Sequence, residues 1–294
     1  RGLGHRDLFR PFFPAIHFGF PPMNKNSKIL FSGMDGRDVY NISAPFNYRG
    51  IPTIAGRVEK RSEELSAIHL FQEKGNHWTP LPPVSSFAGL QDPCITRIDG
   101  KLLLGGVRFP VSCGEDTQAW QMEFHLANDQ GEFVPAWNGP PKMKDIRFLQ
   151  LANGEILTLT RPQGNPGGRG KIGYCLTPSL ESLNPDKLHD APLLDLCPKE
   201  QWVGGNEAHL LSNGQVGVLG HIAWFGEKGE RHYQSMAFAL DPTSGTHSPC
   251  EIIARRRDFP YGPAKRPDLE DVIFSGGLLR LPEQTARLFA GLSD

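Results

Sequence analysis

Residues 98–109 read IDGKLLLGGVRF, an Asp-Gly dipeptide followed by a stretch rich in leucine and valine. Asp-Gly and Asn-Gly are the strongest short signals for a β-hairpin, because the favoured two-residue turn needs positive φ at both central positions. We therefore predict a tight turn centred on Gly100, with antiparallel strands before and after it.

The same pattern recurs along the chain. Comparable stretches are YRGIPTIAGRVE at 48–59, ANGEILTLTRPQ at 152–163, SNGQVGVLGHIA at 212–223 and, more weakly, LPEQTARLFAGLSD at 281–294. Successive turn glycines are 50, 54 and 60 residues apart in the four clear copies, at Gly50, Gly100, Gly154 and Gly214. Such a period is typical of propeller blades with variable insertions.

The repeat predicts an all-β fold, a five-bladed β-propeller that forms a single domain over residues 1–294. The blade hairpins are expected near 41–59, 91–109, 145–163, 206–223 and 271–294. Helical periodicity is scarce elsewhere. Only residues 61–74 (RSEELSAIHLFQEK) can pass as an amphipathic helix, and they fit a strand nearly as well.

Polar residues fall at matching positions in these copies. Seven residues after the turn glycine come Arg57, Arg161 and His221 in three of the copies. The matching polar groups on the incoming strands, together with the end of the fifth copy, are Asn41, Asp92, Lys144 with Asp145, Asn206 with Glu207, Asp271 and Asp294. Both strands of a hairpin run away from its turn, so all these groups are expected at one open end. Charges there are costly unless they meet water, a partner or a ligand. The pattern indicates a binding site, with structural salt bridges between blades as the alternative.

The composition limits the classes of partner that the protein can bind. The 31 basic and 32 acidic residues give a formal charge of -1, which argues against nucleic acid or an anionic membrane as the main partner. No apolar run approaches the roughly 18 residues that a membrane-spanning helix needs. The five cysteines form no CxxC motif, so we expect reduced thiols, no metal, no cofactor and a cytoplasmic location.

Several ordered motifs resemble one family. They are Gly56-Arg57-Val58-Glu59, Leu90-Gln91-Asp92-Pro93, Met143-Lys144-Asp145-Ile146-Arg147, Gly205-Asn206-Glu207, Gly220-His221-Ile222-Ala223 and Lys265-Arg266-Pro267-Asp268. The chain resembles, over residues 41–294, the β-1,2-mannosyltransferase/phosphorylase family, formerly a domain of unknown function. That family is similar to the mannoside phosphorylases of glycoside hydrolase family 130, which are five-bladed propellers.

The resemblance implies roles for individual residues. Asp92 matches the catalytic general acid. The phosphate-binding residues implied are Lys144, Arg147, Arg161, His221 and Tyr233. Asp294 resembles an aspartate that holds the mannose hydroxyls, and the remaining substrate-binding candidates are Asn41, Arg57, Asn206, Glu207 and Asp271. The chain departs from the pattern where a second lysine is common, since it reads Gly205-Asn206-Glu207-Ala208-His209 there. This departure puts the identity of the acceptor in question.

The resemblance therefore implies an inverting β-1,2-mannoside phosphorylase or mannosyltransferase. Inorganic phosphate would attack a β-mannoside oligosaccharide to give α-mannose 1-phosphate, or mannose 1-phosphate would react in reverse. A β-mannoside hydrolase is an alternative, with Glu59, Glu64, Glu207 or Asp271 as the base. The same residues also fit a GDP-mannose-dependent mannosyltransferase or a non-catalytic carbohydrate-binding propeller. Among the tryptophans, Trp224 is the best candidate for stacking on a sugar.

Overall fold

The computed structural model describes residues 26–82, 86–282 and 285–294, which are almost entirely β. The described residues form five antiparallel sheets. The first sheet has the order β1-β3-β4-β5, with β2 beside β3 and β6 beside β4. Its strands are β1 (Asp38–Tyr40), β2 (Phe46–Tyr48), β3 (Ile51–Glu59), β4 (Ala67–Lys74), β5 (His77–Pro80) and β6 (Phe87–Ala88).

The other sheets follow in chain order. The second sheet contains β7 (Leu90–Ile98), β8 (Lys101–Cys113), β9 (Asp116–Ala127) and β10 (Phe133–Pro141). The third contains β11 (Arg147–Gln150), β12 (Ile156–Thr160) and β13 (Gly173–Thr177), and the short helix α1 (Pro185–His189) follows it. The fourth contains β14 (Trp202–Leu210), β15 (Val216–Phe225), β16 (Arg231–Leu240) and β17 (Glu251–Ala254). Two 3₁₀ helices, Arg256–Asp258 and Pro267–Leu269, lead to the fifth sheet, β18 (Ile273–Arg280) and β19 (Ala286–Leu292).

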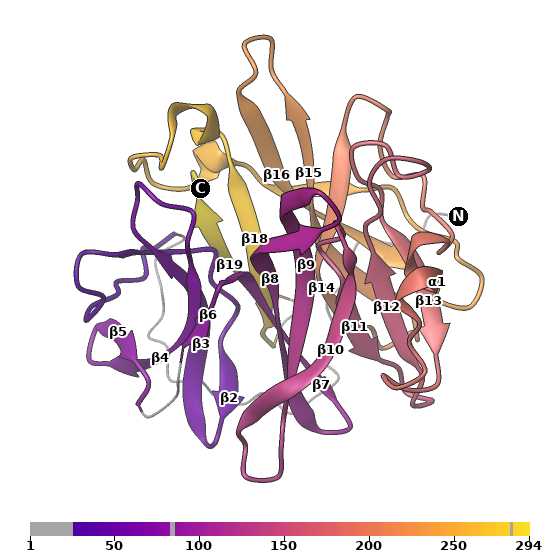
Figure 1. Cartoon of the computed structure of the whole chain (residues 1–294), viewed down its shortest axis with the longest axis horizontal. Helices are drawn as coiled ribbons and strands as arrows, with labels where there is room; N and C mark the ends of the chain where they lie inside the picture. Colours follow the sequence, from indigo (N-terminus) through magenta and orange to yellow (C-terminus); the bar gives the residue numbers. More distant parts are fainter. Residues whose placement is uncertain (1–25, 83–85, 283–284) are drawn as a thin grey trace.

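The sheets form a propeller. The inner strands β7, β11, β14 and β18 contact one another in chain order, and β3 contacts β7 (Figure 1). The fifth sheet closes the ring against the first. A Cβ atom added to Gly276 on β18 would lie 1.6 Å from the carbonyl oxygen of Ile42, so the backbones meet at a distance that only glycine permits.

The predicted number of blades needs correction. Among the described residues, four sheets have three or more strands and are blades, whereas the fifth hairpin is a two-stranded sheet, so this part of the chain has four blades and not five. The prediction counted turns, and in each clear copy at least one further strand pairs with the hairpin.

The hairpin turns have the expected backbone. Arg49 and Gly50 have φ values of 52° and 82°, and Asp99 and Gly100 have 49° and 76°, as a two-residue turn with positive φ requires. Residues 67–74 form β4, in which Ile68 and Leu70 are buried, so the ambiguous stretch is a strand over its second half. No helix in the described part of the chain is long and apolar enough to cross a membrane.

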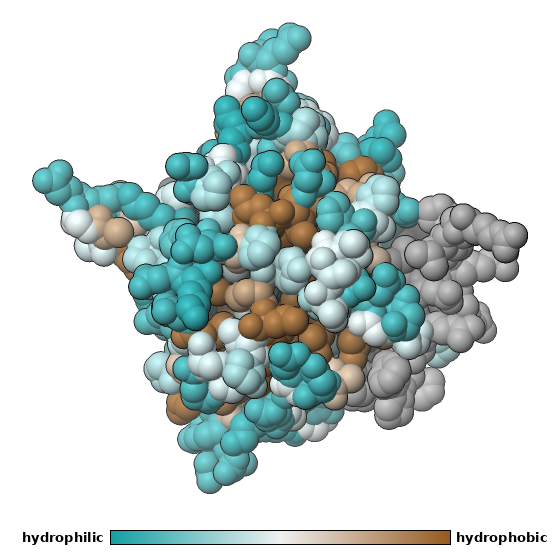
Figure 2. All heavy atoms as spheres, turned by 90° about the vertical axis from the view of Figure 1, so that its right-hand side faces the viewer, coloured by the Kyte–Doolittle hydropathy of each residue, from teal (hydrophilic) through white to brown (hydrophobic). Residues whose placement is uncertain are grey.

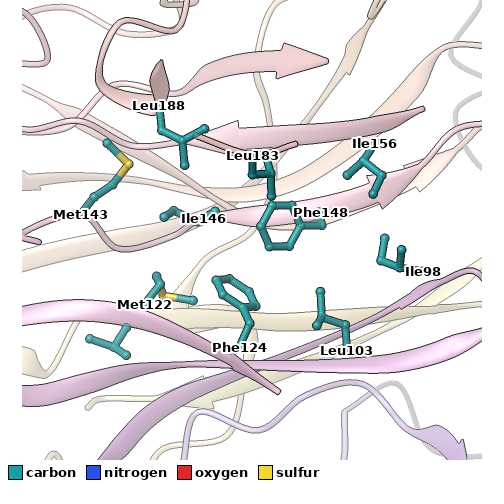
Figure 3. Close-up of a cluster of buried hydrophobic side chains, with 11 residues drawn as sticks. Ile98, Leu103, Met122, Phe124, Met143, Ile146, Phe148, Ile156, Leu183 and Leu188 are labelled. Atoms are coloured by element: carbon teal, nitrogen blue, oxygen red, sulfur yellow. The ribbon is translucent and has the colours of Figure 1, made fainter. Parts of the chain in front are cut away.

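The core lies between neighbouring sheets. One cluster joins Leu103, Met122 and Phe124 of the second sheet to Ile146 and Phe148 at the third (Figure 3). The Phe124 and Phe148 rings lie 4.8 Å apart, centre to centre. On the face in Figure 2, apolar atoms gather in the middle and hydrophilic atoms cover the projecting arms. Burial of apolar surface between sheets therefore holds the inner strands, and the residues they carry, in fixed positions.

Candidate active site

Interrupted inner strands position the polar side chains. Asn41, Asp92 and Asp145 have φ values of 44°, 49° and 60°, in the left-handed region that Asn and Asp tolerate better than most residues. Asp92 also lies in a register shift between β7 and β8, and Asn206 lies in one between β14 and β15. A bulge bends a strand and re-aims a side chain. Each of the four larger sheets thus presents one such residue at its inner strand.

Two carboxylates form the centre of a first group, which we call the carboxylate cluster: Asn41, Arg57, Asp92 and Asp294. Nδ2 of Asn41 donates to Oδ1 of Asp92 at 2.8 Å and to Oδ2 of Asp294 at 3.0 Å. Nη1 of Arg57 lies 3.3 Å from each of the same two oxygens. The structure therefore brings together four predicted residues from the first, second and fifth sheets.

Buried charges support this cluster from behind. Nη2 of Arg57 lies 2.8 Å from Oε2 of Glu59. Lys265 also donates to Glu59, and its Nζ lies 3.6 Å from Oδ1 of Asp294. The side chains of Glu59 and Lys265 are only 0% and 3% exposed. Because cations fully engage Glu59, this carboxylate is not free to activate a water molecule.

Lys265 was not among the predicted site residues. It lies in the connection between the fourth and fifth sheets, outside any strand, so the hairpin spacing gave no signal for it. The only signal in the sequence was its place in the motif Lys265-Arg266-Pro267-Asp268.

Asp294 has an unusual titration. Burial raises the pKa of its carboxyl to about 6, and Asp92 and Glu59 add to this effect, while Arg57 and Lys265 oppose it. Its side chain is 3% exposed, against 20% for Asp92. Asp92 is therefore the carboxylate that an entering ligand can reach more easily.

A second group, the basic cluster, consists of Lys144, Arg147, Arg161 and His221 around Asp145. Oδ2 of Asp145 lies 3.3 Å from Nε of Arg161 and 3.9 Å from Nε2 of His221. Oδ1 lies 3.9 Å from Nη2 of Arg147. Burial alone would raise the pKa of Asp145, but Arg161, His221, Arg147 and Lys144 together lower it. The buried carboxylate is thus ionised and holds the cations in place.

His221 is a neutral member of the basic cluster. Burial lowers its pKa to about 4, and the nearby cations add to this effect while Asp145 opposes it. Nδ1 lies 2.8 Å from Oδ1 of Asn206, an acceptor, so the ring carries its proton on Nδ1. The ring of Tyr233 stacks on His221 at 5.4 Å. Tyr233 thus lies beside the basic cluster.

Lys144 connects the two clusters. Burial lowers its pKa, and the charges of Asp145, Arg161, Asp92 and Arg57 all act on it. These charges belong to both clusters, so Lys144 lies within electrostatic range of each.

Two buried amide atoms remain unpaired in these clusters. Oδ1 of Asn41 and Nδ2 of Asn206 have no hydrogen-bond partner among the described residues. Such atoms are costly in a folded protein and are often found at functional sites. They offer an acceptor in the carboxylate cluster and a donor beside the basic cluster, where Asn206 pairs with His221.

The structure places two predicted residues outside both clusters. Oδ2 of Asp271 lies 2.7 Å from Nδ1 of His232, and the Asp271 side chain is 48% exposed. In β18 the register shift lies between Ser275 and Gly277, so Gly276 occupies the position that a polar residue holds in the other interrupted inner strands. Glu207 accepts from the backbone N–H of Leu278 at 2.7 Å and lies 2.9 Å from His209 Nε2, so it joins the fourth sheet to the fifth.

The basic cluster has the chemistry of an oxyanion site. Three cations surround one carboxylate, and backbone carbonyls anchor both arginines: Arg161 Nε donates to Val203 at 3.0 Å and Arg147 Nε to Asn206 at 2.7 Å. Guanidinium groups held in this way match the geometry of phosphate oxygens. Among the described residues, no group of three or more His, Cys, Asp or Glu is arranged to hold a metal ion.

Comparisons with known proteins give consistent results. The family model described as protein of unknown function (DUF1861) matches residues 21–294. A comparison with curated proteins gives no match. A solved mannose phosphorylase from Leishmania mexicana, in complex with phosphate ion, is 33% identical, with a TM-score of 0.83 over 92% of this chain and 85% of that one.

Two further solved structures are similar. A GDP-Man-dependent mannosyltransferase from Leishmania mexicana is 29% identical, with a TM-score of 0.80 over 90% of this chain and 84% of that one. A β-1,2-mannobiose phosphorylase from Listeria innocua is 17% identical, with a TM-score of 0.58 over 88% of each chain, and it shares the fold.

Proposed function

Since this chain belongs to the protein family described as DUF1861, we propose that it is an inverting β-1,2-mannoside phosphorylase that also runs in reverse as a mannosyltransferase. The protein is an enzyme of the mannoside phosphorylase and mannosyltransferase kind. The linkage, the role of each residue and the direction of the reaction belong to the proposal. The observation that carries it is the pair of clusters: Asp92 contacts Asn41 and Arg57 in the first, and Arg147, Arg161 and His221 surround Asp145 in the second.

The chemistry follows from these two clusters. Oδ1 of Asp92 accepts from Asn41 and Arg57, and in the proposed reaction Oδ2 carries the proton that Asp92 gives to the leaving glycosidic oxygen. A phosphate oxygen attacks C1 of the mannose from the opposite face. The old C1–O bond breaks as the new C1–O–P link forms, which gives α-mannose 1-phosphate with inversion. Phosphate is already an anion, so this reaction needs no general base. Asp294 and Asn41 would hold mannose hydroxyls beside Asp92.

The charges support phosphate as the nucleophile over water. An inverting hydrolase needs a second carboxylate about 6.5–9.5 Å from the acid, free to activate water. Glu59 is taken up by Arg57 and Lys265, and Asp271 bonds to His232. Lys144, Arg147 and Arg161 instead leave positive charge beyond that of Asp145, as binding of a phosphate dianion requires.

A nucleotide-sugar transferase is the second candidate. Asn206 pairs with His221 in the region where the resemblance implies a further phosphate-binding lysine. Fewer cations would weaken the binding of inorganic phosphate, which is the acceptor of the mannosyl group in phosphorolysis. The similarity to the GDP-Man-dependent mannosyltransferase supports the same candidate.

The test is incubation with β-1,2-mannobiose, with and without inorganic phosphate, followed by identification of the products. Formation of α-mannose 1-phosphate only with phosphate is the expected result. Free mannose that forms equally well without phosphate would overturn the proposal in favour of hydrolysis. Transfer from GDP-mannose, without phosphorolysis, would establish the second candidate. Asp92→Asn should lose about 10²–10⁴-fold in turnover while it still binds mannobiose.

A further inference from the structure

A groove of about 690 Å³ lies outside both clusters, on the fourth sheet and the segment that precedes it. Its lining includes Ile222 and Trp224 of β15, Gln234 of β16, and Asp195, Gln201 and His247 from connecting segments. None of these residues belongs to the carboxylate or basic cluster. The volume lies within the range of about 300–1,000 Å³ that is typical of ligand sites.

The lining combines apolar surface with polar groups. Asp195, Gln201 and Gln234 contribute a carboxylate and two carboxamides to the lining, beside Ile222 and Trp224. His247 uses Nδ1 to donate to the carbonyl of Ser248 at 2.9 Å, which leaves Nε2 as an acceptor. An indole surface beside carboxamides and a carboxylate suits a pyranose, since C–H groups cover one face of the sugar and hydroxyls its edge.

Trp224 is held in a fixed orientation. Its ring stacks on His232 with centres 5.2 Å apart and an interplanar angle of 15°. His232 in turn is fixed by Asp271, whose Oδ2 lies 2.7 Å from Nδ1 of the ring. A side chain that is already ordered loses little entropy on binding. The contacts of Asp271 thus support the wall of this groove.

The charge of the groove indicates which class of ligand it can bind. The described lining residues include Asp195 but no lysine or arginine. A phosphate-bearing ligand such as a nucleotide sugar is therefore disfavoured, and a neutral one is favoured.

The groove also adjoins the basic cluster along the chain. Ile222 directly follows His221, and Gln234 directly follows Tyr233; the two lining residues are cross-strand partners. Side chains alternate between the two faces of a strand. The same pair of strands therefore carries the basic cluster on one side and the groove on the other.

We propose that this groove is a second carbohydrate-binding site, which takes a neutral oligosaccharide of the substrate class by stacking on Trp224. The choice of β-mannosides as ligand rests on the proposed function. The site would retain long chains near the active site and would make no difference to a disaccharide that fills the active site alone.

The experiment measures direct binding of β-1,2-mannotetraose by calorimetry in the full chain. An Asp92→Asn background, used without inorganic phosphate, lowers turnover by about 10²–10⁴-fold. Trp224→Ala in that background should weaken binding about tenfold. Tyr261→Ala is the matched control, because Tyr261 is 98% exposed and does not line the groove, and it should bind as the parent does.

Kinetics separate this proposal from the proposed function. Trp224→Ala should leave kcat/KM for mannobiose unchanged and raise KM for the tetraose. Equal tetraose affinity in Trp224→Ala and the parent, or no tetraose binding by the parent, overturns the groove proposal. Absence of any turnover with mannobiose counts against the proposed function alone, since binding in the groove is measured independently of turnover.

Discussion

Lys265 and Arg266 are neighbours in the sequence, yet their side chains lie in opposite environments. Lys265 is 3% exposed and bonds to the fully buried Glu59, whereas Arg266 is 42% exposed and pairs with Glu64, which is 50% exposed. Removing one partner of a buried pair costs about 3–5 kcal/mol, because the other charge is left unpaired. An exposed pair contributes only about 0–1 kcal/mol.

We therefore expect Lys265→Met to lower the free energy of unfolding by about 3–5 kcal/mol. Arg266→Met is the matched control and should change it by no more than about 1 kcal/mol. Urea denaturation of both variants measures the difference. Equal losses in the two variants would contradict the assigned network.

Individual candidate site residues could be predicted where they lie a fixed number of residues from a turn glycine. Arg57, Asp92, Arg161 and His221 follow from this count, because an Asn-Gly, Asp-Gly or Arg-Gly turn lies seven or eight residues away, and the structure places them in the two clusters. The fifth copy has no such glycine, so Asp271 was chosen in place of the position that Gly276 occupies.

At the scale of elements, the inner strands matter because they are imperfect. A regular strand would alternate its side chains between faces and direct none of them along the strand. The left-handed residues Asn41, Asp92 and Asp145 break this alternation. Sequence pattern predicted the strands, but it did not predict the bulges, because Asn and Asp are equally common in ordinary turns.

Gly276 gives a test of how the elements join. A Cβ at this position would lie 1.6 Å from the Ile42 carbonyl oxygen, and backbone cannot move aside as a flexible side chain can. Gly276→Ala should therefore lower the free energy of unfolding by at least about 3 kcal/mol. It should also reduce activity, since Ile42 directly follows Asn41 of the carboxylate cluster.

Gly262→Ala is the control for this substitution. A Cβ there meets its nearest atom, Nη2 of Arg256, at 4.0 Å, an ordinary contact. Thermal unfolding and mannobiose turnover, measured on both variants, give the comparison. A Gly276→Ala variant as stable and active as Gly262→Ala would mean that the first and fifth sheets do not meet in this way.

At the scale of the whole molecule, hairpin spacing predicted the propeller but not the number of blades. A turn dipeptide indicates only the two strands on either side of it. Whether a hairpin is part of a blade depends on the strands that follow, such as β9, β13 and β16, and these lack a spacing signal of their own. Hairpin spacing predicted that the polar residues lie at one end of the sheets. It did not predict their division into two clusters, because that depends on how neighbouring sheets pack around one axis.

The free energy of unfolding of the whole protein should depend on pH through two groups whose effects oppose each other. The pKa of Asp294 rises from 3.8 to about 6 on folding, so its contribution to stability is present below pH 3.8 and is lost as the pH rises through 6. The pKa of His221 falls from 6.5 to about 4, so its contribution is present above pH 6.5 and is lost as the pH falls through 4. The two effects share one pH window, have opposite signs, and amount to about 3 kcal/mol each.

Asp294→Asn removes the first effect and leaves the second. The free energy of unfolding of this variant, relative to that of the wild type, should therefore rise by about 3 kcal/mol between pH 4 and pH 6.5. His221→Gln should show the reverse, a relative fall over the same window. Denaturant unfolding at several pH values measures both curves. Parallel curves for wild type and both variants would show that neither group is buried as described, and the two clusters would then lose their electrostatic basis.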